Sequence, residues 1–491
     1  MFAPLSSPSR VTLWVTLALS STLPGLFRPS TTEAADTAPS LQRPPTRGPL
    51  RVHPQNPRYF ADATGQARLL VGSHTWNNVQ DMGTNDPPAA FDFNAYLDFL
   101  DRHHHNFIRL WRWELVSWDT EANREAQSQR HRCAPHPWAR TGPDLALDGK
   151  PKFDLAQFDR SYFERLRSRV VAARDRGIYV SIMLFEGWGL QFVKEAWKAH
   201  PFHPDNSVQG VNGDPSGDGK AVEIHTLGDP RITALQEAYV RQVVDTVNDL
   251  DNVLYEISNE NHPPSTDWQY HFIRFLHDYQ KTKPRQHPVG MTFQYRGGEN
   301  RALFGSPADW ISPNPDAASG FNYRTNPPAA DGAKVILTDT DHLWGIGGNP
   351  AWVWKSFARG LNPIFMDPYD DRVLSRGSQD QWEPVRRAMG VVARLAERLD
   401  LAAMQPRPVL ASTGYCLADT GRAYVVFVPD DSGATITVNL AGTEGTYAVE
   451  WIHPVTGKMV PSGSVRGGGI ETLELPRPGE LALCLRRSLA P

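Results

Sequence analysis

The fold is decided by one stretch, Asn252-Val253-Leu254-Tyr255-Glu256-Ile257-Ser258-Asn259-Glu260-Asn261-His262. Its first half is rich in apolar and β-branched residues, which favour a strand buried on both faces. Its second half is polar and runs into Pro263-Pro264, which ends the strand in a loop. Parallel α/β barrels carry their chemistry at the carboxyl ends of their strands. We therefore interpret the stretch as a barrel strand that presents Asn259 and Glu260, although this dipeptide alone also fits an ordinary strand-to-loop boundary.

Apolar strands and amphipathic helices alternate on both sides of this stretch. The expected strands cover 68–76, 107–114, 178–186, the run from Val253, 288–293, 309–312, 335–339 and 362–367, and the expected helices cover 91–105, 159–176, 230–250, 266–282, 351–359 and 383–399. Eight strands with interleaved helices predict a (β/α)₈ TIM barrel of the α/β class. A small hairpin that begins at residue 50 and turns near residues 62–65 is expected before the barrel. The long segments 117–154 and 187–226 are expected to be loops that surround the site.

The two ends of the chain differ from this pattern. Arg10, an apolar run over 11–19 and small residues around Ala34-Ala35 predict a cleavable signal over 1–35, followed by a linker over 36–49. We expect a secreted or periplasmic protein with no membrane contact after cleavage; the alternative, an uncleaved anchor, is disfavoured because polar residues and Pro24 interrupt the run. The barrel is expected over 50–404, and short alternating runs over 405–491 predict a small antiparallel β-sandwich.

Composition narrows the possible partners. The chain has 491 residues and a formal net charge of −4, with no long basic run. Phosphate backbones require a concentrated positive face, so nucleic acid is not an expected partner. The sequence suggests no cofactor and no metal. Cys416 and Cys484 fall in the tail region, where they could pair in an exported protein or remain two buried thiols, and Cys133 would be free.

Acids, amides and aromatic residues dominate the ends of the expected strands. Candidate ligand-binding residues are His74, Trp76, Arg109, Arg112, Glu114, Glu186, Trp188, Asn259, His342, Trp344, Asp367 and Tyr369, and the candidate catalytic residues are Glu260, Asp339 and Asp341. Aromatic faces stack on sugar C–H surfaces, and amides and carboxylates bind hydroxyl groups. Two carboxyl groups on facing strands can cleave a glycosidic bond. The set predicts a carbohydrate substrate, although about half of the fifteen Trp residues are expected to be core.

The chain resembles the glycoside hydrolases of clan A, and more closely the cellulase-like barrels whose C-terminal domain is described as collagen-binding. The resemblance rests on the stretches 59–62, 72–76, 106–111, 254–260 and, in the tail, 414–419. It implies that Glu260, after Asn259, is the acid/base. It also implies that Arg109 holds a nucleophile at the end of the seventh strand.

The seventh strand departs from the clan pattern. The clan nucleophile is a Glu, whereas this chain offers Asp339 and Asp341, which share one face of a strand by period 2. Alignment with the clan pattern favours Asp339. The shorter side chain leaves both a retaining and an inverting course open, and we expect retention.

Three functions compete at this point. The leading hypothesis is an exported retaining glycosidase. The second is a barrel that binds carbohydrate but has lost its nucleophile. The third is a metal-dependent hydrolase using His74, Glu186, Asp341 and His342, which is disfavoured because the first strand lacks a closely spaced His pair.

Overall fold

The computed structural model describes residues 44–123, 129–317, 320–374 and 377–488. The expected signal over 1–35 and most of the expected linker lie outside these ranges. Within them, no helix is both long enough and apolar enough to cross a bilayer.

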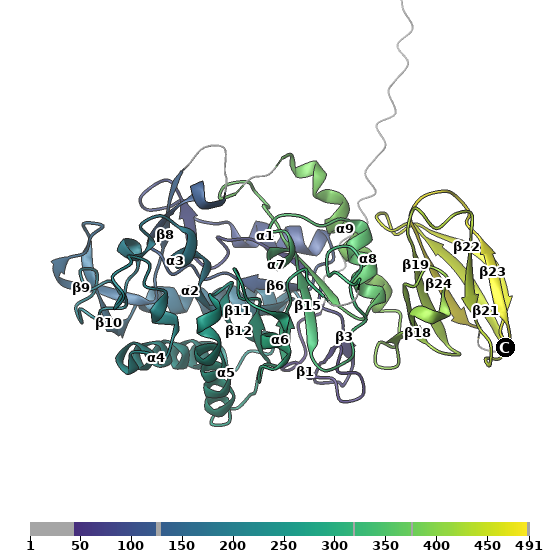
Figure 1. Cartoon of the computed structure of the whole chain (residues 1–491), viewed down its shortest axis with the longest axis horizontal. Helices are drawn as coiled ribbons and strands as arrows, with labels where there is room; N and C mark the ends of the chain where they lie inside the picture. The colour runs from purple at the N-terminus through teal and green to yellow at the C-terminus, as the bar shows by residue number, and fades with distance from the viewer. Residues whose placement is uncertain (1–43, 124–128, 318–319, 375–376, 489–491) are drawn as a thin grey trace, which may run out of the picture. The chain divides into compact units, whose positions relative to one another are not determined.

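A closed parallel barrel forms the larger part of the fold, as predicted (Figure 1). Its eight strands are β4 (Gly72–His74), β6 (Phe107–Leu110), β11 (Tyr179–Glu186), β12 (Val253–Asn259), β13 (Val289–Thr292), β14 (Trp310–Ser312), β15 (Val335–Asp339) and β16 (Asn362–Met366). They are hydrogen-bonded in the order β4-β16-β15-β14-β13-β12-β11-β6. The ring closes where the N–H groups of Asn106 and Phe107 donate to Val71 O at 2.9 and 3.1 Å.

Two glycines allow this closure and the filling of the barrel. A Cβ on Gly72 would lie 1.7 Å from Phe107 O, so β4 can approach β6 only with glycine there. A Cβ on Gly290 would lie 1.8 Å from the Trp310 ring, so glycine leaves space for that indole. The barrel interior near the amino ends is a cluster that includes Leu254 and Trp310.

A three-stranded sheet covers the amino-terminal end of the barrel. It consists of β1 (Arg51–Val52), β2 (Phe60–Ala61) and β3 (Ala67–Arg68), and Phe60 belongs to the interior cluster. Asp62 shapes the predicted turn: its carboxylate accepts the Thr64 N–H at 2.9 Å and binds Arg68.

Helices follow the strands at nearly the predicted positions. They are α1 (Phe93–Arg102), α2 (Arg160–Asp175), α4 (Pro230–Val247), α5 (Thr266–Gln280), α8 (Pro350–Ala358) and α9 (Glu383–Ala396), with shorter helices α3 (Trp188–Phe192), α6 (Asn300–Phe304) and α7 (Thr340–Leu343). Three of the first set begin at an aspartate cap, Asp92, Asp159 or Asp229, whose side chain accepts a backbone N–H of the first turn.

The two segments expected to be loops contain regular structure. The first holds β7 (Ser117–Asp119), η1 (Thr120–Asn123), β8 (Arg130–Ala134), β9 (Trp138–Leu145) and β10 (Pro151–Phe158), and β8 lies between β7 and β5 (Asp81–Gly83). The second holds α3, η2 (Ala196–Ala199) and η3 (Val222–His225). Sequences such as Arg130-His131-Arg132-Cys133-Ala134 lack the alternation that reveals a strand, which is why these elements were not predicted. Three further 3₁₀ turns are η4 (Pro263–Ser265), η5 (Gln379–Gln381) and η6 (Pro408–Leu410).

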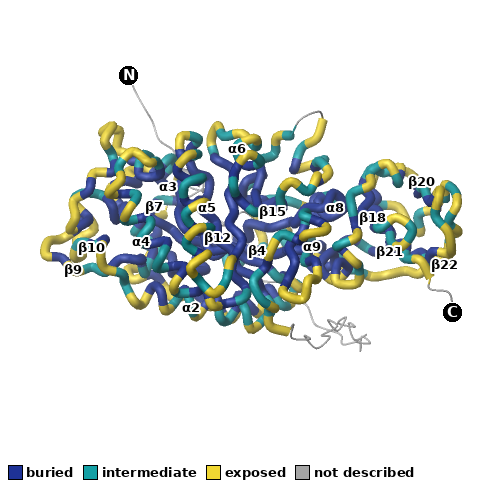
Figure 2. Tube along the Cα trace, turned by 90° about the horizontal axis from the view of Figure 1, so that it is seen from below, coloured by how far each residue is buried: buried dark blue, intermediate teal, exposed yellow. Residues whose placement is uncertain are grey.

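The tail folds into the predicted antiparallel sandwich. One sheet has the order β17 (Gln405–Pro406), β18 (Cys416–Asp419), β19 (Ala423–Val428), β24 (Leu481–Arg487), β21 (Thr446–Ile452) and β22 (Met459–Arg466). The other pairs β20 (Thr435–Asn439) with β23 (Ile470–Glu474). In Figure 2, β12 is buried along its length while β22 at the edge of the tail is largely exposed.

The central strands of the large tail sheet, β19 and β24, are buried on both faces. Tyr424 and Val426 point into the sandwich core, whereas Val425 and Phe427, which alternate with them, belong to the core cluster of the barrel. Phe427 stacks on Trp354 of α8, with ring centroids 6.3 Å apart. The sandwich therefore shares a continuous apolar interface with the barrel.

The three cysteines are free and buried. Cys416 lies in the sandwich core, while Cys484 lies in the cluster shared with the barrel, so the two thiols face opposite sides of the sheet. The sequence left open a disulfide between Cys416 and Cys484 or two buried thiols, and the structure has two buried thiols.

We expect Phe427→Ala to lower the free energy of unfolding by about 3–5 kcal/mol, because it removes a fully buried aromatic ring from this interface. Val460→Ala is the control, since Val460 is 43% exposed on β22, and its effect should stay within about 0.5 kcal/mol. Denaturant unfolding of both variants measures the difference, and equal stability would contradict the shared interface.

Candidate active site

A buried arginine, Arg109 of β6, lies at the centre of the polar layer inside the barrel. Its Nε and Nη2 donate to the two oxygens of Glu256 at 2.8 and 2.6 Å, and Nη2 also donates to Asn259 Oδ1 at 2.7 Å. Nη1 donates to Asp339 Oδ2 at 3.1 Å and to Asp341 Oδ2 at 2.9 Å. A guanidinium has five N–H donors, so these five bonds use all of its capacity. Burial opposes the charge, but these anions hold the pKa of Arg109 well above its usual value.

Glu256 is a functional residue that the sequence reasoning missed. It lies inside β12, paired with Met183 of β11 and Gly290 of β13, and it is fully buried. The available signal was a charged residue within an otherwise apolar strand, because such a residue requires a buried counter-charge. Glu256 provides the bidentate partner of Arg109.

Asp339 is enclosed by protein on every side. It ends β15 and caps α7, where it accepts the Asp341 N–H at 3.0 Å, and it also binds His74 Nε2 at 3.0 Å and Arg109. Burial would raise its pKa, but the charges of His74 and Arg109 lower the pKa well below the usual range. Asp339 is therefore an anion that holds α7 and His74 in place.

Asp341 differs from Asp339 although both bind Arg109. It lies in the first turn of α7, is 7% exposed and faces the cleft described below. Burial raises its pKa to about 6, against the effect of Arg109 and with the help of the Asp339 charge. Asp341 can therefore exchange its proton near neutral pH.

Glu260 lies one residue beyond β12 with a left-handed backbone, φ +42°. Gln191 Nε2 donates to its carbonyl at 2.8 Å and fixes this turn. A non-glycine residue in this region is strained, and such strain is found at functional sites. Burial, and then the charge of Asp341, raise the pKa of Glu260 well above its usual value, which favours its neutral acid form.

Asn259 is oriented by its neighbours. Its Oδ1 accepts from Arg109 and lies 3.2 Å from His342 Nε2, and His342 Nδ1 lies 2.7 Å from Ser312 Oγ. Burial lowers the pKa of His342 to about 3, so the ring is neutral and donates from Nε2. The carbonyl oxygen of Asn259 is occupied twice, which leaves its NH₂ group for a ligand.

These groups open onto a cleft of about 570 Å³ at the carboxyl ends of the strands. Three carboxylates, Glu186, Glu260 and Asp341, line its floor together with Asn259 and His342. Its aromatic lining consists of Trp76, Trp111, Trp113, Trp188, Phe192, Phe293, Tyr295 and Trp344. Such a surface suits a ligand with alternating apolar faces and hydroxyl edges.

Glu186 ends β11 beside Asn259 of β12. Its two oxygens accept the N–H groups of Trp188 and Gly189 at 2.8 and 2.9 Å. Burial still raises its pKa to about 8. It contributes a largely protonated carboxyl group to the cleft at neutral pH.

Seven of the candidate residues are not in the cleft lining: His74, Arg109 and Asp339 belong to the buried network around Arg109, and the other four lie elsewhere. Arg112 and Glu114 alternate with Trp111 and Trp113 and face the opposite side, where Glu114 binds Arg112 at 2.9 Å, His200 at 2.9 Å and His225 at 3.2 Å. Asp367 is fully buried and binds Arg386 of α9, and Tyr369 packs on Tyr96 and Phe99 of α1. His74 contacts the site through Asp339, and Trp76, Trp188, His342 and Trp344 line it directly.

Asn78 and Gln80 are further residues that the sequence reasoning missed. The strand expected over 107–114 ends at Leu110, and these two amides replace the missing neighbour strand. Asn78 binds Arg109 O at 2.6 Å and the Trp111 N–H at 2.7 Å, and Gln80 accepts the Trp113 N–H at 2.6 Å. They hold Trp111 and Trp113 in the cleft.

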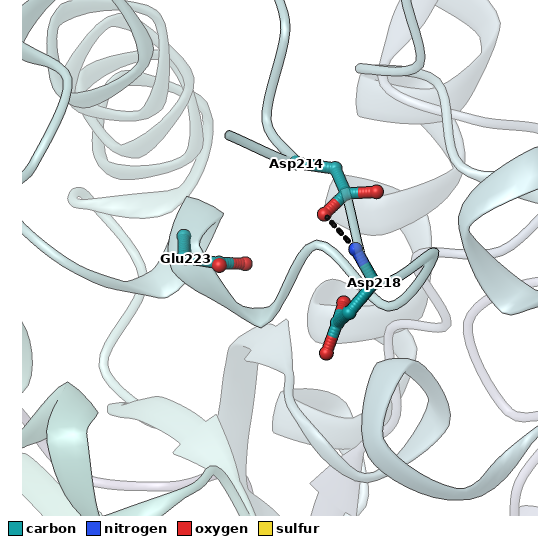
Figure 3. A group of neighbouring side chains, drawn as sticks. All are labelled: Asp214, Asp218 and Glu223. Atoms are coloured by element: carbon teal, nitrogen blue, oxygen red, sulfur yellow. Dashed lines mark hydrogen bonds between the residues drawn. The ribbon is translucent and has the colours of Figure 1, made fainter. Parts of the chain in front are cut away.

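One acidic group could be read as a metal site. Asp214, Asp218 and Glu223 have oxygens within 4.8 Å of one another (Figure 3). Asp214 already accepts the N–H groups of Gly217, Asp218 and Gly219, so its geometry is that of a loop-shaping residue. Within the described ranges, His74, Glu186, Asp341 and His342 do not form a comparable group.

Comparisons with known proteins agree on the fold. Residues 133–294, from β8 to just past β13, match a domain of unknown function, DUF6298. No curated protein matched the chain. A solved structure described as a glycoside hydrolase is 12% identical, with a TM-score of 0.58, over 90% of this chain and 97% of that one. A glycoside hydrolase family 5 structure from Bacteroides vulgatus ATCC 8482 is 12% identical, with a TM-score of 0.59, over 90% and 94%. The likeness confirms the predicted barrel and tail fold.

We expect Arg109→Lys to destabilise the protein although the charge is kept, because lysine offers three donors in place of five. Leaving buried carboxylates partly unpaired should cost about 3 kcal/mol of unfolding free energy. Arg160→Lys is the control, since Arg160 and Glu164 form an exposed pair, and it should cost no more than about 0.5 kcal/mol. Denaturant titration measures both, and equal losses would show that the donor count is unimportant.

Proposed function

We propose that the chain is a glycoside hydrolase in which Glu260 is the general acid/base and Asp341 the nucleophile. The observation that carries the proposal is the unequal environment of two carboxyl groups in one aromatic-lined cleft. Asp341 is bound to Arg109, whereas no cation among the described residues is bonded to the Glu260 carboxyl group. The pKa of Asp341 is therefore raised only to about 6, and that of Glu260 is raised well above its usual value. When two neighbouring carboxyl groups have different pKa values, the group with the higher pKa can serve as the acid and the other as the anion.

Asp341 suits the nucleophile role better than Asp339, which clan alignment favoured. Asp339 is 1% exposed, its oxygens bind His74, Arg109 and the Asp341 N–H, and it is not part of the cleft lining. A nucleophile must reach the anomeric carbon. We assign Asp339 a positioning role and Asp341 the covalent one.

The proposed reaction has two steps and retains the anomeric configuration. Glu260 gives its proton to the glycosidic oxygen while an Asp341 oxygen attacks the anomeric carbon, so the C–O bond to the leaving sugar breaks and a glycosyl ester forms. Water then attacks that carbon, Glu260 takes the water proton, and the ester bond to Asp341 breaks. The free NH₂ of Asn259 would bind a sugar hydroxyl beside the reacting carbon.

Two further observations support a carbohydrate substrate. The cleft lining combines indoles with amide and carboxyl groups, as sugar recognition requires. The two solved structures with the same fold carry glycoside hydrolase titles. Fold analogy alone does not establish activity, so the assignment rests mainly on the site.

We also propose that the protein is exported, on the basis of the apolar run and small residues within 1–35. Amino-terminal sequencing of the protein recovered outside the cytoplasm should show cleavage near Ala34-Ala35. Recovery of uncleaved protein in the cytoplasm alone would contradict export.

The acid role predicts a leaving-group effect. Glu260→Gln should abolish turnover of unactivated glycosides and spare activated aryl glycosides, whose departure needs little protonation. Asp341→Asn should stop both, because no ester can form. Steady-state rates on matched unactivated and aryl glycosides test both expectations. Mass spectrometry of a trapped glycosyl ester locates the nucleophile. Binding without turnover by the wild-type chain on a broad glycan panel would instead favour a non-catalytic binding barrel.

The pKa values predict a bell-shaped pH profile. Activity requires ionised Asp341, so kcat/KM should rise as the pH increases through about 6. It requires protonated Glu260, so kcat/KM should fall at higher pH as that raised pKa is passed. A profile that is flat from pH 5 to pH 7, about the range spanned by this titration, would remove Asp341 from the nucleophile role.

A further inference from the structure

The mouth of the cleft carries two arginines that have no carboxylate partner among the described residues. Arg296 follows β13, and Arg324 lies between β14 and β15. Both side chains line the cleft and both residues are exposed, whereas the three carboxylates of the floor are buried. The positive charges therefore lie at the entrance, above the reacting groups.

Aromatic rings restrain both guanidinium groups. Arg296 Cζ lies 5.5 Å from the ring centroid of Tyr295 and 5.6 Å from that of Phe192. Arg324 Cζ lies 5.8 Å from the ring centroid of Trp344, and its Nε donates to Leu343 O. Contact with an aromatic face limits the motion of a guanidinium while its terminal N–H edge stays available. That edge matches the paired oxygens of a carboxylate or sulfate.

The surrounding charges do not neutralise these arginines. Asp316 is the other exposed charged residue of the lining, and it forms no ion pair with either arginine. On the floor, burial raises the pKa of Glu186 to about 8, so Glu186 is mainly neutral at pH 7, and burial also raises the pKa of Glu260 well above its usual value. The entrance thus keeps a surplus of positive charge.

We propose that Arg296 and Arg324 form a subsite for an anionic group of the glycan, either the carboxylate of a uronic acid or a sulfate ester. The anionic group belongs to a sugar unit bound at the mouth, because the ionised Asp341 carboxylate on the floor would repel it beside the bond that breaks. This inference rests on the proposed glycosidase function and names its substrate class.

Calorimetric titration of the full-length Glu260→Gln variant tests the subsite without turnover. The probes are uronate oligosaccharides with their carboxyl-reduced counterparts, and sulfated oligosaccharides with their desulfated counterparts. At low salt we expect the anionic member of a pair to bind about 10-fold more tightly. The advantage should shrink at high salt, since exposed charges are screened. A preference within the uronate pair identifies the group as a carboxylate, and a preference within the sulfated pair identifies it as a sulfate.

Substitutions locate the effect. Arg296→Gln or Arg324→Gln, added to Glu260→Gln, should each reduce the anionic preference by about 5-fold. Arg301→Gln is the matched control, because Arg301 is exposed, pairs with Glu299 at 2.5 Å and is outside the cleft lining; it should keep the full preference. Equal affinity for both members of every pair, absence of binding by every anionic probe, or equal losses in the control would overturn the subsite. Failure of the glycosidase assignment is seen separately, as absence of turnover by the wild-type chain on glycans that bind.

Discussion

The bidentate pair between Arg109 and Glu256 is the interaction on which the rest of the site depends. A buried cation is costly unless every donor is satisfied. Arg109 meets this requirement with five bonds to residues from β12, β15 and α7. Strands that are not neighbours in the ring are thereby held at fixed distances across the barrel. Because Asn259 and Asp341 are among the partners, the same bonds that stabilise the interior also set the geometry of the cleft.

This single cation also gives the acidic side chains different properties. Asp339 binds both Arg109 and His74 and has a lowered pKa, whereas Asp341 binds Arg109, lies 3.6 Å from the neutral His342 ring and has a pKa of about 6. In the part of the chain that the structure describes, no cation is bonded to the Glu260 carboxyl group, and burial raises its pKa well above the usual value. The cations bonded to each carboxyl group, and not its distance from Arg109, separate an inert anion, a titrating carboxylate and an acid with a raised pKa. The proposed chemical roles follow from this order, since Glu260 and Asp341 are buried to a similar extent.

The sequence predicted what is local and missed what depends on contacts across the barrel. Buried parallel strands are continuous apolar runs, so the strands and Asn259-Glu260 could be located from β12 outward. Arg112 and Glu114 are expected in the site because they end the predicted strand 107–114, yet the strand stops at Leu110 and the two side chains lie opposite Trp111 and Trp113. Asp367 also lies outside the cleft lining, because its carboxylate binds Arg386 of α9, a contact that the strand pattern does not show. Glu256 was hidden because its role requires Arg109, and sequence spacing does not show which interior residues meet.

The aspartates of β15 show how a shorter side chain can still reach the cleft. In the clan that the chain resembles, a Glu ends the seventh strand, and Asp339 at that position is one methylene shorter. Here Asp339 instead caps α7 by accepting the Asp341 N–H at 3.0 Å. The chain then turns into the helix, and Asp341 projects from its first turn rather than from the strand end. The turn of the backbone into α7 thus brings the Asp341 carboxylate to the cleft, which the shorter side chain of Asp339 does not reach. Asp339 remains necessary because, without this cap, neither α7 nor Asp341 would be held against Arg109.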